Sequence, residues 1–165
     1  MIAYLGIGTN LGDRTANLNR AVVLIAEQAG RVLACSSFVE SEPWGFDSEN
    51  TFLNAVVAIN TPHTPHQLLA ATQAIERSMG RHHKTTNGHY TDRIIDIDIL
   101  LYGNLTIDSP DLKIPHPHIM QRPFVYEPLQ EIAPDIGSSD IFLGRADCLG
   151  GLMAPPSTGL VSKHL

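Results

Sequence analysis

The sequence of 165 residues is short of the features that mark several large classes of protein. It has 2 cysteines, Cys35 and Cys148, and neither lies in a CxxC or Cys/His metal-binding pattern. A disulfide-stapled scaffold and a zinc finger are therefore excluded. The sparse cysteine usage favours a reducing, cytoplasmic location, in which both thiols serve as packing residues.

Basic residues and long apolar runs are also scarce. The chain has 11 Lys and Arg against 17 Asp and Glu, a formal net charge of -6. Non-specific binding to nucleic acid needs clustered cations, so no nucleic-acid partner is expected. No apolar stretch reaches the roughly 18 residues that span a bilayer, and no basic segment precedes the apolar run at residues 2–5. We therefore expect neither a membrane association nor a signal peptide.

The sequence does contain apolar segments whose spacing alternates between strand-like and helix-like. One helix starts with the capping-box pattern Thr64-Pro65-x-Gln67, and Gly80 follows its end. The expected elements are a strand at 2–8, a helix at 13–29, strands at 31–39 and 51–60, a helix at 65–79 and a strand at 94–102.

The order βαββαβ predicts an α+β domain with a ferredoxin-like core, in which two helices cover one face of an antiparallel sheet. A single domain is expected over residues 1–135. The tail at 136–165 loses periodicity and collects Gly, Ser and Pro, so it carries no predicted structure and its role is unknown.

Two aspartates interrupt the last apolar strand. Asp96 and Asp98 are two residues apart, so both carboxylates project from one face while the flanking isoleucines point to the other. Two like charges about 7 Å apart on an apolar strand need a positive partner, and hard divalent cations prefer oxygen ligands. The pair favours a magnesium site. The alternative is a surface ion pair with Arg93 or Lys84.

A cationic stretch precedes this strand: Arg81, His82, His83, Lys84, His89 and Arg93. Arginine forks match phosphate oxygens in shape and charge, so a polyphosphate bridging metal and arginines is one interpretation. The other is a solvated loop with no particular role. The neighbouring aspartates favour the first.

Two further patterns are less specific. Gly6-Ile7-Gly8-Thr9-Asn10-Leu11-Gly12 has neither the third glycine of a dinucleotide fingerprint nor a P-loop lysine, so both nucleotide motifs are rejected. Gln73 and Glu76 lie opposite the apolar stripe of their helix and indicate a solvated face.

Aromatic residues and histidines leave alternatives open in two loops. Trp44 and Phe46 are either core residues or a platform for a flat heteroaromatic ligand. His116 and His118 lie in a turn-rich segment, where a zinc site is conceivable but a plain turn is favoured.

The motifs together resemble 6-hydroxymethyl-7,8-dihydropterin pyrophosphokinase, an enzyme family of folate synthesis. The most specific match is Asp-Arg-Ile-Ile-Asp-Ile-Asp-Ile-Leu at 92–100. Ile7-Gly8-Thr9-Asn10-Leu11-Gly12, Phe52-Leu53-Asn54-Ala55, Ile75-Glu76, Gly80-Arg81 and Ile114-Pro115-His116 support it in the same order. The likeness covers roughly residues 1–135.

The resemblance implies transfer of pyrophosphate from ATP to the pterin alcohol, with two Mg²⁺ ions on Asp96 and Asp98, in a monomer. It implies catalytic roles for Arg81 and Arg93 beside the aspartates. The implied ATP-binding residues are Gln73, Glu76, Arg81, His83, Arg93, Ile99, His116 and Arg122. The implied pterin-binding residues are Ser41, Glu42, Pro43, Trp44, Phe52, Asn54, Asp96 and Phe124.

The chain departs from the family pattern between the second helix and the last strand. His83 stands where many relatives have a second arginine, Tyr90 replaces a tryptophan, and the loop is one residue longer. Two rival functions remain: a nucleotidyltransferase that attacks the α-phosphorus, and a ferredoxin-like binding or metal-sensing module without catalysis.

Overall fold

The structure, a computed structural model, describes residues 1–81 and 91–136. Residues 137–165, nearly all of the predicted tail, lie outside this description. The elements are β1 (Ile2–Thr9), α1 (Arg14–Gln28), β2 (Arg31–Cys35), β3 (Val39–Ser41), β4 (Phe52–Asn60), α2 (Pro65–Ser78), β5 (Asp96–Tyr102), β6 (Ile107–Asp108), β7 (Lys113–Ile114) and α3 (Pro123–Ile132). None of the described helices is long and apolar enough to cross a membrane.

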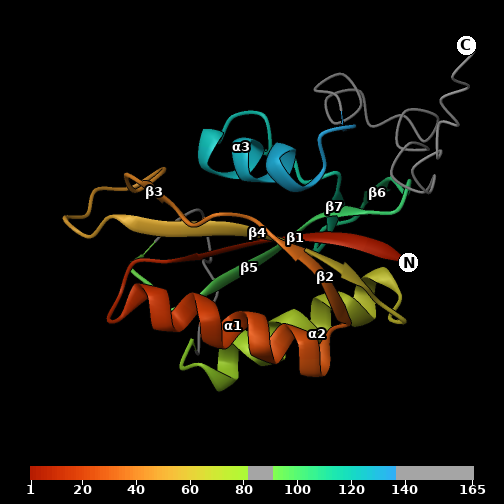
Figure 1. The fold of residues 1–165 in the computed structure, drawn as a ribbon, viewed down its shortest axis with the longest axis horizontal. Helices are drawn as coiled ribbons and strands as arrows, with labels where there is room; N and C mark the ends of the chain where they lie inside the picture. Colours follow the sequence, from red (N-terminus) through yellow and green to blue (C-terminus); the bar gives the residue numbers. More distant parts are fainter. Residues whose placement is uncertain (82–90, 137–165) are drawn as a thin grey trace, which may run out of the picture.

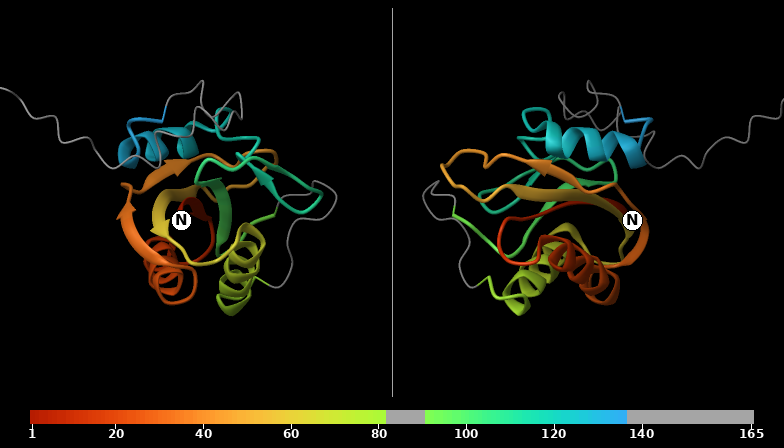
Figure 2. Two further views of the ribbon diagram at one scale, coloured as in Figure 1. Left: turned by 90° about the vertical axis from the view of Figure 1, so that its right-hand side faces the viewer. Right: turned by 60° about the vertical axis from the view of Figure 1, so that its left-hand side comes forward.

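The main sheet has the strand order β2-β4-β1-β5, with β3 also paired to β4, and every pairing is antiparallel. Helices α1 and α2 lie side by side on one face, and α3 crosses the other (Figures 1 and 2). The predicted ferredoxin-like α+β fold is thereby confirmed. Helix α3 and the small β6–β7 sheet are additions to it that the sequence pattern did not predict.

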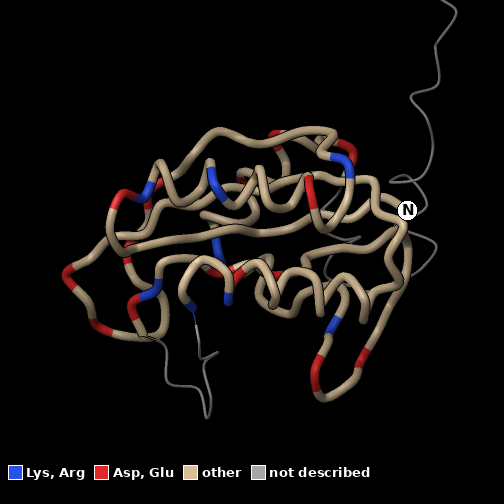
Figure 3. The backbone as a smooth tube through the Cα atoms, turned by 90° about the horizontal axis from the view of Figure 1, so that it is seen from below, with Lys and Arg blue, Asp and Glu red and all other residues tan. Residues whose placement is uncertain are grey.

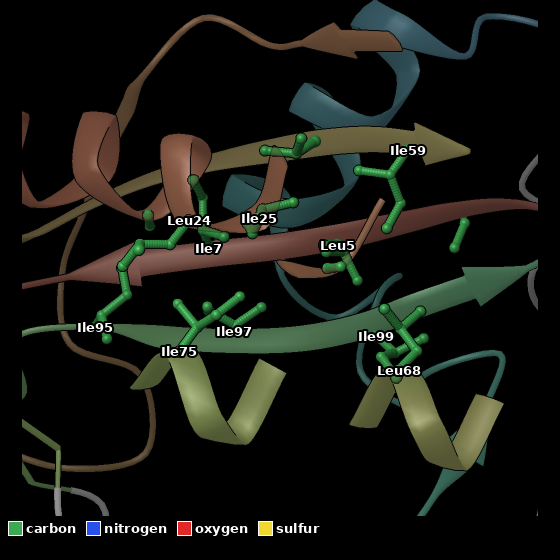
Figure 4. Packing of buried hydrophobic residues seen from close by; sticks show 14 of the residues in the cluster. Leu5, Ile7, Leu24, Ile25, Ile59, Leu68, Ile75, Ile95, Ile97 and Ile99 are labelled. Atoms are coloured by element: carbon green, nitrogen blue, oxygen red, sulfur yellow. The ribbon is translucent and has the colours of Figure 1, made fainter. Parts of the chain in front are cut away.

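The main core lies between the sheet and helices α1 and α2. Alternate residues of β1 and β5 point into it, among them Leu5, Ile7, Ile97 and Ile99, and they meet Ile75 of α2 (Figure 4). Each fully buried aliphatic side chain of this size contributes about 1.5–3 kcal/mol. The alternation therefore fixes which face of each strand looks away from these helices.

A smaller core occupies part of the opposite face. Tyr4, Val56 and Leu100 of the sheet pack there against Leu129 of α3. Helix α3 has 10 residues and covers only part of this face. The remainder of this face carries glycine, asparagine and aspartate, and it becomes the floor of a cavity.

Two strand boundaries differ from the sequence prediction. The strand expected at 31–39 breaks after Cys35, because Ser36 bonds to Val56 through both its backbone N–H and its hydroxyl. The strand expected to begin at Ile94 begins at Asp96 instead. Pro123 and Pro128 both lie within α3, and a proline inside a helix obscures its sequence pattern.

The predicted capping box of α2 is present and can be tested. The Thr64 hydroxyl accepts from the Gln67 backbone N–H at 3.3 Å, while the Gln67 side chain accepts from the Thr64 N–H at 2.9 Å. Replacing Thr64 by alanine is expected to lower the free energy of unfolding by about 1 kcal/mol in urea titration. Thr64→Ser keeps the hydroxyl and should lose far less; equal losses would contradict the cap.

Candidate active site

A cavity of about 530 Å³ opens on the sheet face that α1 and α2 do not cover. Its floor comes from β1, β4 and β5, and its walls come from the segment around Trp44, the β6–β7 hairpin, and residues 116–125. Elements from opposite ends of the sequence therefore meet there. A space of this size suits a small-molecule ligand.

Two glycines of β1 make the floor low. Gly8 pairs with Asp96 on one side and Asn54 on the other, and Gly6 pairs with Asp98. A Cβ on Gly8 would stand 3.0 Å from the Asn54 side-chain oxygen, and one on Gly6 would stand 3.3 Å from Leu100. Because glycine has no side chain, these two positions leave the space above the sheet open. The sequence signal for this role is the two-residue spacing of the glycines on one strand, which the comparison with nucleotide-binding motifs does not reveal.

The two aspartates lie half-buried in this cavity, on the face that the alternation predicted. Asp96 forms an ion pair with Arg81, and its second oxygen is 3.8 Å from Arg93 Nε. Burial by itself lowers the pKa of the Arg81 guanidinium, but Asp96 and Glu76 outweigh it and raise that pKa. Asp96 is therefore part of a largely buried charge network with Arg81, Arg93 and Glu76, and not an exposed surface ion. Lys84, the other cation of that alternative, lies outside the described residues.

Glu76 corrects the prediction of a solvated helix face. Its side chain is 3% exposed, accepts the backbone N–H of Ile97 at 2.7 Å, and lies 3.3 Å from Arg81. The carboxylate satisfies a free N–H at the open edge of β5 and holds Arg81 toward Asp96. Gln73, one turn earlier, is only half-buried. The helical pattern could not show this, because the demand for an acceptor comes from the strand.

Aromatic side chains form the other end of the cavity. The Arg122 guanidinium lies 4.2 Å from the centroid of the Trp44 ring, and the His118 ring lies 5.1 Å away. Phe52 packs edge-on against Phe46, and Arg93 lies over both rings. Trp44 thus lines the cavity, as the ligand-platform alternative required.

Asn54 is fixed at the floor by its own amide. Its Nδ2 donates to the Val39 carbonyl at 3.1 Å and to the Ser41 hydroxyl at 2.9 Å. Its side-chain oxygen is the atom that approaches Gly8. The orientation of the amide is therefore set by protein contacts before any ligand enters.

Most of the predicted site residues line this one cavity. They are Ser41, Glu42, Trp44, Phe52, Asn54, Arg81, Arg93, Asp96, Asp98, Ile99, His116, Arg122 and Phe124. Among the described residues, Pro43, Gln73 and Glu76 do not line it. His83 and Tyr90 lie outside the described residues.

Sequence reasoning missed several lining residues. His118 was assigned to a plain turn together with His116, yet both contribute to the wall. The β6–β7 hairpin adds Asp111 and Lys113, which no motif marked. Only the folded chain brings this hairpin beside β5.

The donor set suits magnesium better than zinc. Within residues 1–81 and 91–136, no three His, Cys, Asp or Glu side chains group closely enough to hold a metal alone. Magnesium is commonly held by one or two carboxylates together with substrate phosphates, and it keeps several waters. Asp96 and Asp98 beside arginines fit that pattern. Acidic and basic residues are otherwise interspersed along the chain (Figure 3).

The fold and the site define a class: a ferredoxin-like α+β domain with two aspartates and several arginines lining one cavity. Comparison with known proteins is specific. Residues 4–134 match the family model of 7,8-dihydro-6-hydroxymethylpterin-pyrophosphokinase (HPPK). The chain belongs to this family.

Individual relatives agree with the family match. A 2-amino-4-hydroxy-6-hydroxymethyldihydropteridine pyrophosphokinase of Porphyromonas gingivalis is 49% identical over 134 residues, covering 81% of this chain and 91% of that protein. Proteins of the same name from Methylorubrum extorquens and Bacillus subtilis are 44% and 39% identical, with 84% and 80% of their lengths covered.

Solved structures support the fold. A Plasmodium falciparum HPPK-DHPS structure aligns with a TM-score of 0.67 at 16% identity, covering 92% of this chain and 45% of that one. The chain therefore spans less than half the length of that bifunctional protein. At this identity the likeness concerns the fold alone.

Glu76 provides a test of the charge network. Glu76→Ala is expected to lower the free energy of unfolding by about 3 kcal/mol, because it leaves the buried N–H of Ile97 without its acceptor and removes one of the two carboxylates paired with Arg81. Glu76→Gln keeps an acceptor for Ile97 and should cost about 1 kcal/mol. Urea unfolding without ligand measures both. A Glu76→Ala protein as stable as wild type would show that the carboxylate serves only a ligand.

Proposed function

We propose that the aspartates of β5, the arginines around them and the aromatic end of the cavity divide the family reaction between metal, phosphate and pterin. As a member of the family, the chain is a pyrophosphokinase that transfers pyrophosphate from ATP to 6-hydroxymethyl-7,8-dihydropterin in folate biosynthesis. The observation that carries the proposal is the paired carboxylates on a glycine floor, flanked by buried arginines.

Asp96 and Asp98 would hold two Mg²⁺ ions, which neutralise phosphate charge and lower the pKa of a bound alcohol. Arg81 and Arg93, already beside Asp96, would turn toward phosphate oxygens when metals take over the carboxylates. Arg122 supplies a further cation, since its buried Nε has no hydrogen-bond acceptor among the described residues. His116 and the strand edge at Ile99 complete the proposed ATP side, together with His83, which lies outside the description. Gln73 and Glu76 do not line the cavity, so Glu76 would act on ATP through Arg81, and Gln73 would contact the nucleotide only beyond the present lining.

The pterin would occupy the aromatic end. A flat ring stacks on Trp44 and Phe124, and Asn54 offers a pre-oriented amide to the polar edge of the ring. Ser41, Glu42 and Phe52 complete this wall, and Asp96 faces it from the floor. Pro43, which does not line the cavity, would shape the chain between Glu42 and Trp44. The placement puts the hydroxymethyl group toward the aspartates.

In the proposed reaction, the hydroxymethyl oxygen attacks the β-phosphorus of ATP, and AMP leaves. The protein's part is alignment and charge compensation, so no nucleophilic side chain is needed. The side chains of Arg81 and Arg93 are already buried beside Asp96 without substrate. The proton of the attacking hydroxyl group passes to water or to a phosphate oxygen.

A monomeric, cytoplasmic protein with one domain at residues 1–135 is also proposed. Sparse cysteine usage supports the location, and the site needs no second chain, since every proposed lining group comes from this one. The tail beyond residue 135 is assigned no role.

Asp98 gives the direct test of the metal proposal. Asp98→Ala should lower the rate of AMP formation from ATP, Mg²⁺ and pterin by at least about a hundredfold, since metal stabilisation contributes several kcal/mol. Separation of the nucleotides measures AMP. The exposed Asp47, replaced in the same way, should leave the rate unchanged. Release of pyrophosphate in place of AMP would support the rival function as a nucleotidyltransferase. The absence of any turnover would support the binding module.

Phe124 tests the pterin end separately. Phe124→Ala is expected to raise KM for the pterin about tenfold with KM for ATP unchanged, because only the stacked ring loses its platform. Phe124→Leu retains part of the side-chain bulk, so its KM for the pterin should lie between those of the wild type and Phe124→Ala. Steady-state rates with each substrate varied give both constants. A matching rise in KM for ATP would contradict this division of the cavity.

A further inference from the structure

A hydrogen-bonded clamp holds Arg93 from outside the cavity. Asn10, which follows β1 and is 3% exposed, donates its backbone N–H to the Arg93 carbonyl at 3.1 Å. Its side-chain oxygen accepts the Arg93 backbone N–H at 2.7 Å. Both backbone polar groups of Arg93 are thus satisfied by one residue. The position of this arginine is fixed relative to β1, and hence to the glycine floor.

The Asp92 carboxylate joins this clamp to the loop that carries Trp44. One carboxylate oxygen accepts from Asn10 Nδ2 at 2.8 Å, and the other accepts from Asn50 Nδ2 at 2.7 Å. The Ser48 hydroxyl, with Asn50 and Asn10, lowers the pKa of Asp92 despite some desolvation. The group therefore stays ionised and acts as an acceptor only.

The ends of that loop are fixed independently. Arg14 of α1 donates to the Thr51 carbonyl and hydroxyl at 3.1 and 2.9 Å, and to Glu40 at 2.7 Å. Residues 40 and 51 are therefore held against the domain on either side of the loop. Between them, Asn50 and Ser48 connect the loop to Asp92, and Trp44 contacts Arg122.

We infer that Asp92 is a positioning residue. Its carboxylate fixes the loop that carries Trp44 relative to the backbone of Arg93, so that the pterin wall and the phosphate-side arginine keep a set distance from each other. The inference deepens the proposed function and rests on it for the identity of the two ligands. No feature of the cavity itself requires Asp92, which lies outside the lining. Its role is to couple two segments that are 40 or more residues apart in the sequence.

Asp92→Asn tests the coupling by replacing one carboxylate oxygen with an NH₂ group. An amide offers one acceptor oxygen, and its NH₂ would face the NH₂ of Asn50, so the hydrogen bond from Asn50 breaks. We expect kcat/KM for the pterin to fall about tenfold, the effect of one hydrogen bond to a charged group. Trp44 is the only tryptophan of the chain, so its quenching by acrylamide without substrate reports on the loop directly. Quenching is expected to increase about twofold.

The double variant Asp92→Asn with Asn50→Asp is the matched rescue. It exchanges donor and acceptor across the same contact: the new amide at 92 donates to the new carboxylate at 50 and still accepts from Asn10. Net charge and volume are unchanged. Both kcat/KM and quenching should return to within about threefold of wild type, which a general loss of stability would not do.

Asp47→Asn, in the same loop but exposed, is the control for altered charge, and unfolding midpoints accompany every variant. Wild-type quenching and kinetics in Asp92→Asn would overturn the inference, and so would a double variant as impaired as the single one. Quenching is measured without ATP or pterin. A failure of the proposed reaction would therefore leave the quenching result standing, whereas a failure of the coupling would leave AMP formation intact.

Discussion

The alternation of side chains along β5 is the constraint on which the rest of the structure depends. Ile97 and Ile99 enter the main core, and the same pleat turns Asp96 and Asp98 to the opposite face. A shift of one residue in register would bury two carboxylates under α2 and expose the isoleucines, at a cost far above the stability of a domain. The hydrophobic core therefore places the acidic pair.

The acidic pair in turn determines its surroundings. Two carboxylates on a half-buried strand require compensation, and Arg81 supplies it while Glu76 of α2 holds Arg81 in place. A buried ion pair adds little net stability because desolvation offsets its attraction, whereas removal of one partner is costly. The charged side chains of the cavity therefore hold one another in place in the absence of a ligand.

The sequence predicted what is local and periodic. The βαββαβ order, the capping box at Thr64 and the direction of Asp96 and Asp98 follow from spacing alone, and the resemblance supplied the pterin and ATP. Prediction from the sequence failed where a residue's partner lies far away in the chain. Glu76 is buried because the N–H of Ile97 needs an acceptor. Gly6 and Gly8 shape the cavity floor because β5 and β4 lie beside them. The wall residues His118 and Lys113 depend on the β6–β7 hairpin, for which no strong pattern exists.

The most direct measurement is a crystal structure with a non-hydrolysable ATP analogue, the pterin and Mn²⁺, whose anomalous scattering locates the metals. Metal peaks are expected about 2.1 Å from the carboxylate oxygens of Asp96 and Asp98, with Arg81 turned from Asp96 to phosphate. Peaks elsewhere, with both aspartates still paired to arginines and the nucleotide outside the cavity, would contradict it.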